Sequence, residues 1–199
     1  MVANPSFIPL TPDEYLEIEE KADIKHEYIE GEIYAMAGAN DTHVTITGNL
    51  FASLLSHLRG SGCRVYIADM KARIERRNRF FYPDVMVTCD PRDRETDTYK
   101  RFPCLIVEVL SDSTEGFDRG DKFSDYQTLE TLQEYVLVNT KHRRIDCFRR
   151  ERDGIWLFQS YDDERGTFEL KSVGYTGSID SLYENATLDP GTNAALAIP

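Results

Sequence analysis

Two acidic residues each interrupt an otherwise apolar stretch of the sequence. Asp84 lies in the motif YPDV, and Glu108 lies in the motif IVEVL. Burying an unpaired carboxylate is costly, so each side chain should have a cation, a strong hydrogen-bond donor or a channel of water. If the two segments are neighbouring strands, their axes lie about 4.8 Å apart, and both carboxylates can reach one ion.

These carboxylates suit a divalent metal ion. Mg²⁺ takes oxygen ligands at about 2.0–2.1 Å and retains several waters, so two carboxylates and one carbonyl are sufficient protein ligands. The backbone carbonyl of Val109, next to Glu108, is the expected third ligand. The alternative is structural, because an aspartate after proline is often a turn former and a single glutamate can be held in a salt bridge. The spacing alone leaves both interpretations open.

A lysine and a tyrosine follow on the next segment of the chain. Lys122 and Tyr126 are four residues apart, which places them on one face of a predicted helix. Because the strand of Glu108 leads into this helix through a short loop, Lys122 can lie over the carboxylates, hold an attacking water and stabilise charge on a phosphoryl group. Tyr126 can hydrogen-bond that water or a phosphate oxygen, or it can pack in the core.

The elements that must position these residues follow from the hydrophobic pattern. The first helix begins at a capping box, and a hairpin turns about Glu30-Gly31. Asp118 is the expected N-cap of the last helix, and the polar residues 90–101 form a loop long enough to be mobile or functional. The expected helices cover residues 11–22, 43–58 and 118–132. The expected strands cover 63–74, 81–89, 104–110, 134–139, 143–150, 154–161 and 168–173.

This order of elements predicts an α/β (α+β) fold. Helix, three strands, helix and strand give a mixed central sheet flanked by helices, with an extra N-terminal helix and hairpin and C-terminal hairpins. We expect a single domain over residues 1–188 and a flexible tail over 189–199, because the tail is rich in glycine, alanine and proline.

The composition and net charge argue against membrane, secreted and disulfide-rich proteins. No stretch is long and apolar enough to cross a bilayer, and no secretory signal precedes the first helix, so we expect a cytoplasmic protein with no membrane partner. The four cysteines lack CxxC spacing, which favours reduced thiols over a disulfide framework or a zinc site. The net charge of −12 argues against a protein that coats nucleic acid with its whole surface. Residues 73–79 and 141–152 are locally basic, either as a rim that attracts phosphate or as solvated hairpin tips.

Taken together, the motifs resemble a known family. YPDV, VEVLSDST, DRGDKFSDYQ and LQEYVLVN, with HEYIEGEIYAM and HVTITGNL upstream, are similar to the Uma-two family of restriction endonucleases, within the restriction-endonuclease-like PD-(D/E)XK superfamily. The resemblance covers about residues 11–188. It implies an αβββαβ core and divalent-metal-dependent cleavage of DNA with Mg²⁺ or Mn²⁺. Asp84 and Glu108 match the two acidic positions, whereas Leu110 stands at the usual lysine position, so the resemblance suggests that Lys122 supplies the ammonium group.

Three further residues are weaker candidates. Glu27 matches a glutamate of the family pattern, and we expect it to be a further acidic ligand or a residue that supports the ligands, with a salt bridge to Lys25 or to an arginine as the alternative. His43 is expected to cap the first long helix, with contact to phosphate as the alternative. Asp69 lies in a strand of apolar and basic residues and is a less favoured metal ligand.

Two hypotheses for function follow. The first is a metal-dependent endodeoxyribonuclease in which Asp84 and Glu108 hold the ion and Lys122 orients the nucleophile. The second is a catalytically inactive module that keeps the nuclease fold and binds nucleic acid or a protein partner, as the acidic composition and the missing in-line lysine indicate. Cleavage of both DNA strands would favour a symmetric homodimer.

Overall fold

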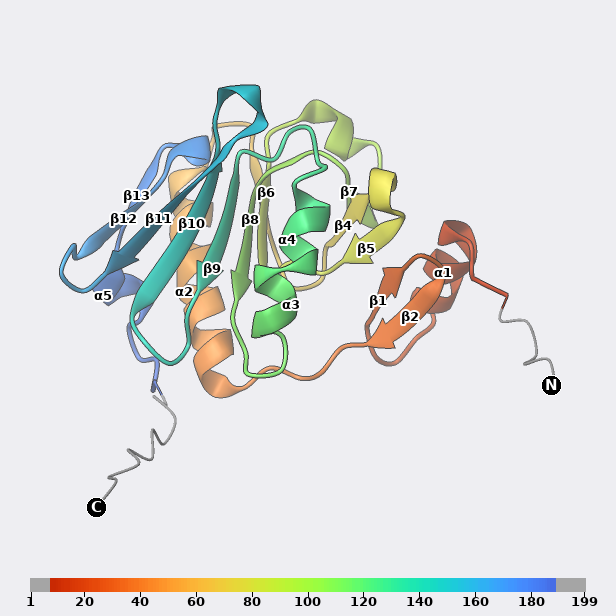
Figure 1. Cartoon of the computed structure of the whole chain (residues 1–199), viewed down its shortest axis with the longest axis horizontal. Helices are drawn as coiled ribbons and strands as arrows, with labels where there is room; N and C mark the ends of the chain where they lie inside the picture. The colour runs from red at the N-terminus through yellow and green to blue at the C-terminus, as the bar shows by residue number, and fades with distance from the viewer. Residues whose placement is uncertain (1–7, 189–199) are drawn as a thin grey trace, which may run out of the picture.

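A six-stranded mixed sheet forms the centre of the molecule (Figure 1). The structure is a computed structural model that describes residues 8–188. The strand order is β11-β10-β9-β8-β6-β3, in which β8 and β9 run parallel and the other neighbours run antiparallel. Every residue of the central strands β8 and β9 is buried, because other elements cover both of their faces. The bounds are β3 Arg64–Ile67, β6 Val85–Thr88, β8 Pro103–Val109, β9 Glu134–Val138, β10 Arg144–Arg150 and β11 Trp156–Asp162.

A five-stranded sheet of order β2-β1-β5-β4-β7 lies toward the N-terminal end of the molecule. Helix α1 (Pro12–Glu19) packs on it through Tyr15, whose ring lies 5.1 Å from the rings of both Tyr28 and Phe80. The predicted capping box of this helix and the predicted hairpin at Gly31 are both confirmed. The bounds are β1 His26–Ile29, β2 Glu32–Ala35, β4 Lys71–Ile74, β5 Arg79–Phe81 and β7 Tyr99–Lys100.

Two of the predicted strands pass from one sheet to the other. The prediction of single strands over 63–74 and 81–89 is wrong, because the first divides into β3 and β4 and the second into β5 and β6. The first break lies at Ala68, whose φ of 52° turns the chain out of the extended conformation. The second break lies at Pro83 and Asp84, and the Ala68 N–H donates to the Asp84 carbonyl at 3.1 Å, so the two crossings lie against each other.

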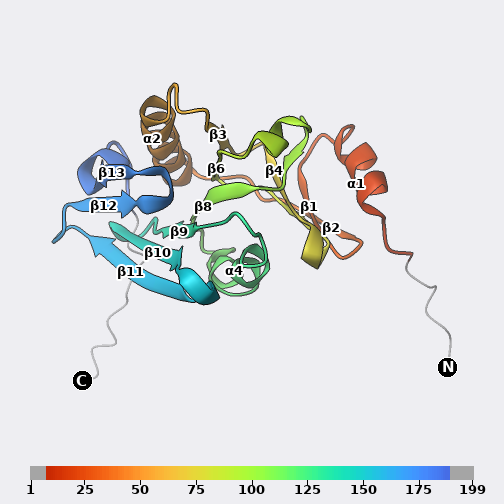
Figure 2. The same ribbon diagram turned by 90° about the horizontal axis from the view of Figure 1, so that it is seen from above.

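Helices cover the two faces of the central sheet. Helix α2 (Asp41–His57) packs on one face, and α3 (Glu115–Arg119) and α4 (Asp121–Tyr126) pack on the other, as Figure 2 shows for α2 and α4. Alternate residues of β8 face the two layers. Val107 belongs to the core cluster of α2, whereas Ile106 belongs to the cluster of α4. Glu108 has the parity of Ile106 and therefore points toward α3 and α4.

The helix predicted over residues 118–132 is shorter and divided. The chain leaves the helical conformation at Gly120, which has φ −112° and ψ −97°, and this residue separates α3 from α4. Asp118 is consequently not an N-cap but a buried residue of α3. Beyond Tyr126 the chain forms turns, and the Thr128 hydroxyl donates to the Asp125 carbonyl at 2.7 Å, which stabilises the end of α4.

The polar segment 90–101 is held in place by two buried charged residues. It contains a short 3-10 helix (Pro91–Arg94) and strand β7. The Asp93 carboxylate accepts hydrogen bonds from the Thr88 hydroxyl at 2.6 Å and from the Arg101 N–H at 2.7 Å. The buried Lys100 ammonium donates to the Asp93 carbonyl at 2.8 Å. The prediction of a loop over this whole segment is therefore wrong, because it contains a short helix and a strand, anchored by local polar contacts that sequence composition does not reveal.

The C-terminal elements extend the core on the side of α2. The predicted hairpin of β10 and β11 is confirmed. The predicted strand over 168–173 is β12 (Thr167–Leu170), which pairs with β13 (Tyr175–Ser178) in a separate two-stranded sheet, and α5 (Ile179–Leu182) follows. The predicted tail 189–199 lies outside the described residues. Among residues 8–188, no helix has the length and apolar character needed to span a membrane.

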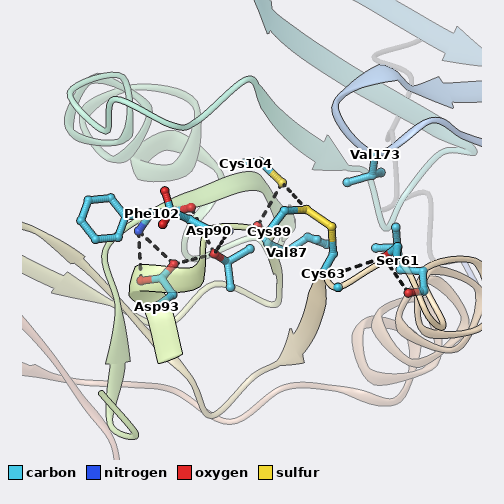
Figure 3. The surroundings of a disulfide bond; sticks show 12 residues. Ser61, Cys63, Val87, Cys89, Asp90, Asp93, Phe102, Cys104 and Val173 are labelled. Carbon is cyan, nitrogen blue, oxygen red and sulfur yellow. Dashed lines mark hydrogen bonds between the residues drawn. A yellow bond between two sulfur atoms is a disulfide. The ribbon is translucent and has the colours of Figure 1, made fainter. Parts of the chain in front are cut away.

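The prediction that all cysteines are reduced is wrong for one pair. Cys63 precedes β3 and Cys89 follows β6, and their sulfur atoms form a disulfide (Figure 3). Because β3 and β6 are antiparallel neighbours, these two ends lie opposite each other, with the Cα atoms 4.0 Å apart. A separation of 26 residues in sequence carries no sign of this pairing. Cys104 and Cys147 are free thiols, as predicted, and both are buried.

Candidate functional site

Asp84, which directly precedes β6, lies next to Glu108 of the neighbouring antiparallel strand β8. The register pairs Val85 of β6 with Val107 of β8, so Asp84 stands opposite Glu108 just beyond the last pair. The Asp84 N–H donates to Glu108 Oε2 at 3.3 Å. The Val109 N–H donates to Asp84 Oδ2 at 2.7 Å. The backbone at Asp84 thus holds the Glu108 carboxylate, and the backbone at Val109 holds the Asp84 carboxylate. The Val109 carbonyl lies beside these contacts in the sequence.

The Lys122 ammonium contacts three carboxylates. It lies 3.1 Å from Glu108 Oε1, 3.1 Å from Glu27 Oε1 and 3.5 Å from Asp118 Oδ1. Glu27 reaches it from β1 of the five-stranded sheet, whereas Asp118 reaches it from the preceding helical turn. The Lys122 and Glu108 side chains are only 8% and 4% exposed, so this cluster is almost dry. Elements from both sheets and from α3 and α4 therefore meet at one ammonium group.

Tyr126 contacts the same carboxylate and also packs in the core. Its hydroxyl donates to Glu108 Oε1 at 3.1 Å. Its ring lies 5.5 Å from the Phe81 ring in an edge-on arrangement, and the side chain is fully buried. The two alternatives for Tyr126 are thus not exclusive. Because Oε1 also faces Lys122, the outward contact of the Glu108 carboxylate is made through Oε2, on the side of Asp84.

The cluster carries more negative charge than one ammonium group balances. Burial raises the pKa of Glu108 well above its ordinary value, the charges of Asp118, Asp84 and Glu27 add to this, and Lys122 opposes it. Burial lowers the pKa of Lys122, but Glu108, Glu27 and Asp118 outweigh burial, so this pKa is raised and the group is charged at neutral pH. A surplus of buried negative charge is the condition under which a further cation binds.

Two residues of the site were assigned other roles from the sequence. The Asn40 side chain caps α2 by accepting from the His43 N–H at 2.9 Å, so the prediction that His43 caps this helix is wrong. The His43 ring instead points to Asp84, with Nε2 3.1 Å from Oδ2. Asp118 was predicted to be an N-cap, but it contacts Lys122. The sequence contained a sign of this contact, because residues four apart on a helix lie side by side. For His43 the sequence held no such signal, because the contact depends on how α2 packs on the sheet.

Asp69 and Glu27, the two further acidic candidates, each form an ion pair with a lysine. Asp69 pairs with Lys25, and its side chain is 79% exposed, so it does not point toward the carboxylates. Glu27 was expected to be an acidic ligand or the salt-bridge partner of Lys25 or an arginine. The salt-bridge partner is Lys122 rather than Lys25 or an arginine, because β1 pairs with β5 and thereby brings Glu27 beside the end of β8. The role of Glu27 as an acidic ligand stays a prediction.

Carboxylate and carbonyl oxygens at this site suit a small divalent cation that keeps part of its water. Within residues 8–188, no three histidine, cysteine, aspartate or glutamate side chains are arranged as a ready metal cage. Mg²⁺ needs only one or two carboxylates, with waters completing its shell, and Asp84, Glu108 and the Val109 carbonyl supply donors of that type. Glu27 Oε1 is buried and, in the described part of the chain, has no hydrogen-bond partner despite its proximity to the Lys122 ammonium. The donor set therefore fits such an ion.

The two basic segments are largely engaged in ion pairs. In the first, Arg79 pairs with Asp125 at 2.9 Å and Arg76 pairs with Glu130 at 3.1 Å. In the second, the acidic partners are Asp163 and Asp180 for Arg143, Asp146 for Arg144 and Glu134 for Arg149. These contacts neutralise much of the positive charge that composition alone assigns to a phosphate-attracting rim.

Known proteins are similar to this chain in sequence or in fold. Residues 12–177 match the model of the family Uma2, described as "Putative restriction endonuclease". The chain belongs to the Uma2 family. The Uma-two resemblance of the sequence motifs is thereby confirmed. This Uma2 protein is 42% identical over 177 residues to "Uncharacterized protein slr1290" of Synechocystis sp., covering 89% of the chain and 93% of that protein. It is 37% identical over 164 residues to "Uncharacterized protein sll1609" of the same organism, covering 81% and 92%.

A solved structure confirms the fold class. The Uma2 chain superposes with a TM-score of 0.71 on the crystal structure of a "putative nuclease belonging to DUF820" from Anabaena variabilis ATCC 29413. The match covers 88% of this chain and 98% of that chain at 17% sequence identity. The predicted α/β architecture, a mixed sheet flanked by helices, is therefore correct.

Proposed function

We propose that this protein is a divalent-metal-dependent endonuclease that hydrolyses phosphodiester bonds in DNA. The observation that carries the proposal is that Asp84, just before β6, lies beside Glu108 of β8, with its N–H 3.3 Å from Glu108 Oε2, and that the Lys122 ammonium lies 3.1 Å from Glu108 Oε1. The family membership supports the reaction class. Restriction endonucleases act on DNA, which is the substrate that we assign on this basis.

Asp84, Glu108 and the Val109 carbonyl would hold Mg²⁺ or Mn²⁺. Such an ion supplies a water of lowered pKa and neutralises charge on the phosphate. Lys122 acts as a hydrogen-bond donor and fixed cation rather than a base, because its carboxylate neighbours raise its pKa and keep it protonated. Its role is to orient the attacking water and to balance charge on the phosphoryl oxygens. Tyr126 holds Glu108 Oε1 and so leaves Oε2 directed toward Asp84.

A catalytically inactive nuclease-fold module that binds nucleic acid or a protein partner is the second candidate. One observation favours it: Leu110, at the usual lysine position, is 2% exposed and packs in the apolar cluster with Tyr126, so β8 contributes no ammonium group. The net charge of −12 points in the same direction. Calorimetric titration with Mn²⁺ separates the two candidates, because the endonuclease requires a bound ion and the inactive module does not.

The test is cleavage of supercoiled plasmid and of a single-stranded oligonucleotide, each with and without Mn²⁺. We expect Asp84→Asn and Glu108→Gln to lower the cleavage rate by about 100-fold or more, since even residues that only hydrogen-bond to a metal ligand contribute about 10–100-fold. Asp93→Asn is the matched control, because Asp93 is as buried as Glu108 but lies at the other end of β6.

Each outcome bears on the assignment. Circular dichroism confirms that every variant is folded before its rate is compared. Cleavage that persists undiminished in purified Asp84→Asn protein would show that the two carboxylates do not form the catalytic site. Loss of cleavage in the Asp93→Asn control alone would place the chemistry elsewhere in the fold.

A further inference from the structure

Three of the four cysteines lie together at one end of the central sheet (Figure 3). Cys63 and Cys89 form the disulfide that joins the edge strand β3 to β6. The sulfur atom of Cys104, on β8, lies 3.8 Å from the sulfur atom of Cys89. Two heavy atoms at this distance are in van der Waals contact. Cys89 therefore touches two cysteine sulfur atoms, one through a covalent bond and one as a free thiol.

A β-bulge turns the Cys104 side chain toward this disulfide. The register between β6 and β8 shifts between Val87 and Thr88, and Thr88 pairs with Pro103. Cys104 and Leu105 belong to the same core cluster, although successive residues of a regular strand point to opposite faces. The Cys104 thiol donates to the Val87 carbonyl at 3.4 Å, which holds it on this face. Bulges that redirect a side chain are over-represented beside active sites.

The three cysteines differ in their access to solvent. Cys89 is exposed and Cys63 is partly buried, whereas Cys104 is only 7% exposed. Burial raises the pKa of the Cys104 thiol to about 11, so a small fraction of it is the reactive thiolate at neutral pH. Its target is already in contact, and intramolecular reactions can have effective concentrations of about 10⁵ M or more. We therefore expect a reaction between Cys104 and the disulfide over minutes to hours.

We propose that these three cysteines form a thiol–disulfide exchange site that releases Cys63 for modification by a small disulfide. The Cys104 thiolate attacks Cys89 Sγ, a Cys89–Cys104 bond forms, and Cys63 leaves as a thiolate. Cys104 gives up one proton and Cys63 can take one up through solvent, so this step consumes neither oxidant nor reductant. The Cys63 thiolate then attacks oxidised glutathione, forms a mixed disulfide and releases reduced glutathione. Neither step needs a metal ion or DNA.

The exchange changes which strands are covalently linked. The Cys63–Cys89 disulfide links β3, at the edge of the sheet, to β6. The Cys89–Cys104 bond links β6 to β8 instead and leaves β3 without a covalent link to its neighbour. The chain leaves β3 at Ala68, whose N–H donates to the Asp84 carbonyl at 3.1 Å. Modification of Cys63 therefore acts on the strand that leads to Asp84.

Disulfide mapping by mass spectrometry tests the exchange on the full-length protein. The protein is kept at pH 8 for several hours with oxidised glutathione and without added thiol, quenched with acid, alkylated in urea and digested with trypsin. Arginine residues lie between the three cysteines, so trypsin places each cysteine on a separate peptide. Because no thiol is added, glutathione reaches Cys63 only after Cys104 has opened the disulfide.

We expect the wild-type protein to yield a Cys89–Cys104 peptide together with glutathione on Cys63. Cys104→Ser should lower the amount of glutathione on Cys63 by about tenfold or more, because the internal nucleophile is then missing. Cys147→Ser is the matched control and should keep the wild-type pattern. Cys147 is also a buried free thiol, but it contacts Glu134 rather than the disulfide.

Two results would overturn the proposal. The first is wild-type protein that retains only the Cys63–Cys89 pair, with Cys104 alkylated as a free thiol. The second is glutathione on Cys104 while the Cys63–Cys89 pair stays intact. Mapping of the wild-type chain decides between these results and the expected one, so the test holds even if Cys104→Ser does not fold.

Discussion

Replacing Lys122 with methionine keeps the length and apolar stem of the side chain and removes its charge. The carboxylates of Glu27, Glu108 and Asp118 lie between 3.1 and 3.5 Å from the ammonium and would lose their shared cation. Removing one partner of a buried ion pair costs about 3–5 kcal/mol, because the remaining charge is left without compensation. We expect Lys122→Met to lower the free energy of unfolding by this amount at neutral pH.

The decrease in the free energy of unfolding caused by Lys122→Met should be larger at high pH than at low pH. Burial raises the pKa of Glu108 above its ordinary 4.5, and Lys122 opposes this shift. Without Lys122 the pKa of Glu108 rises further. A carboxyl group whose pKa is raised by folding contributes stability that is fully present below its unfolded pKa and is lost as the pH rises through the folded value. The variant is therefore closer to the wild-type stability at pH 5 than at pH 8.

Urea unfolding at pH 5 and pH 8, followed by circular dichroism, measures both effects. Arg76→Met is the matched control, because Arg76 lies 3.1 Å from Glu130, the same distance as Lys122 from Glu108, but both side chains are 69% exposed. We expect this control to change the free energy of unfolding by less than about 1 kcal/mol at either pH. Wild-type stability of Lys122→Met at pH 8 would refute the buried, charged state of the cluster.

Three other predictions concern stability. Tyr126→Phe removes a buried donor to Glu108 and should lower the free energy of unfolding by about 1.5–3 kcal/mol in urea; an unchanged midpoint would contradict this. Reducing the Cys63–Cys89 disulfide should cost about 3 kcal/mol, measured as a lower Tm with dithiothreitol, whereas a Cys89→Ser variant should not respond to dithiothreitol. Burial raises the pKa of Asp146, but hydrogen bonds from two arginines and a serine outweigh it, so the pKa lies below 3.8. Asp146→Asn should therefore destabilise the protein at pH 7, and this difference should vanish as the pH falls through the folded value; a difference that does not decrease as the pH falls below 3.8 would count against it.

Several features of the site could be predicted from local patterns. A carboxylate among apolar residues must be compensated wherever its strand lies, which singled out Asp84 and Glu108 without knowledge of the fold. Helical periodicity placed Lys122 and Tyr126 on one face, and the structure places both within 3.1 Å of Glu108. The division of this helix at Gly120 does not disturb that face, because both residues lie in α4.

Other features were decided by contacts between segments far apart in the sequence. Glu27 enters the site because β1 pairs with β5, and His43 enters it because α2 packs on the face of β8 that carries Val109. The Cys63–Cys89 disulfide depends in the same way on the antiparallel register of β3 and β6. No pattern within a single segment encodes these distances.

By itself, the amino-acid sequence determined the family, the α/β class and the two central carboxylates, Asp84 and Glu108. Periodicity and the cost of burying charge act within a few residues, so they can be recognised along the chain. Only the tertiary structure decided which groups surround those carboxylates, since that depends on strand order, on the crossings at Ala68 and Asp84 and on the packing of α2. Two distant segments can pair in many registers, and the register that forms is the one that gives the whole fold the lowest free energy.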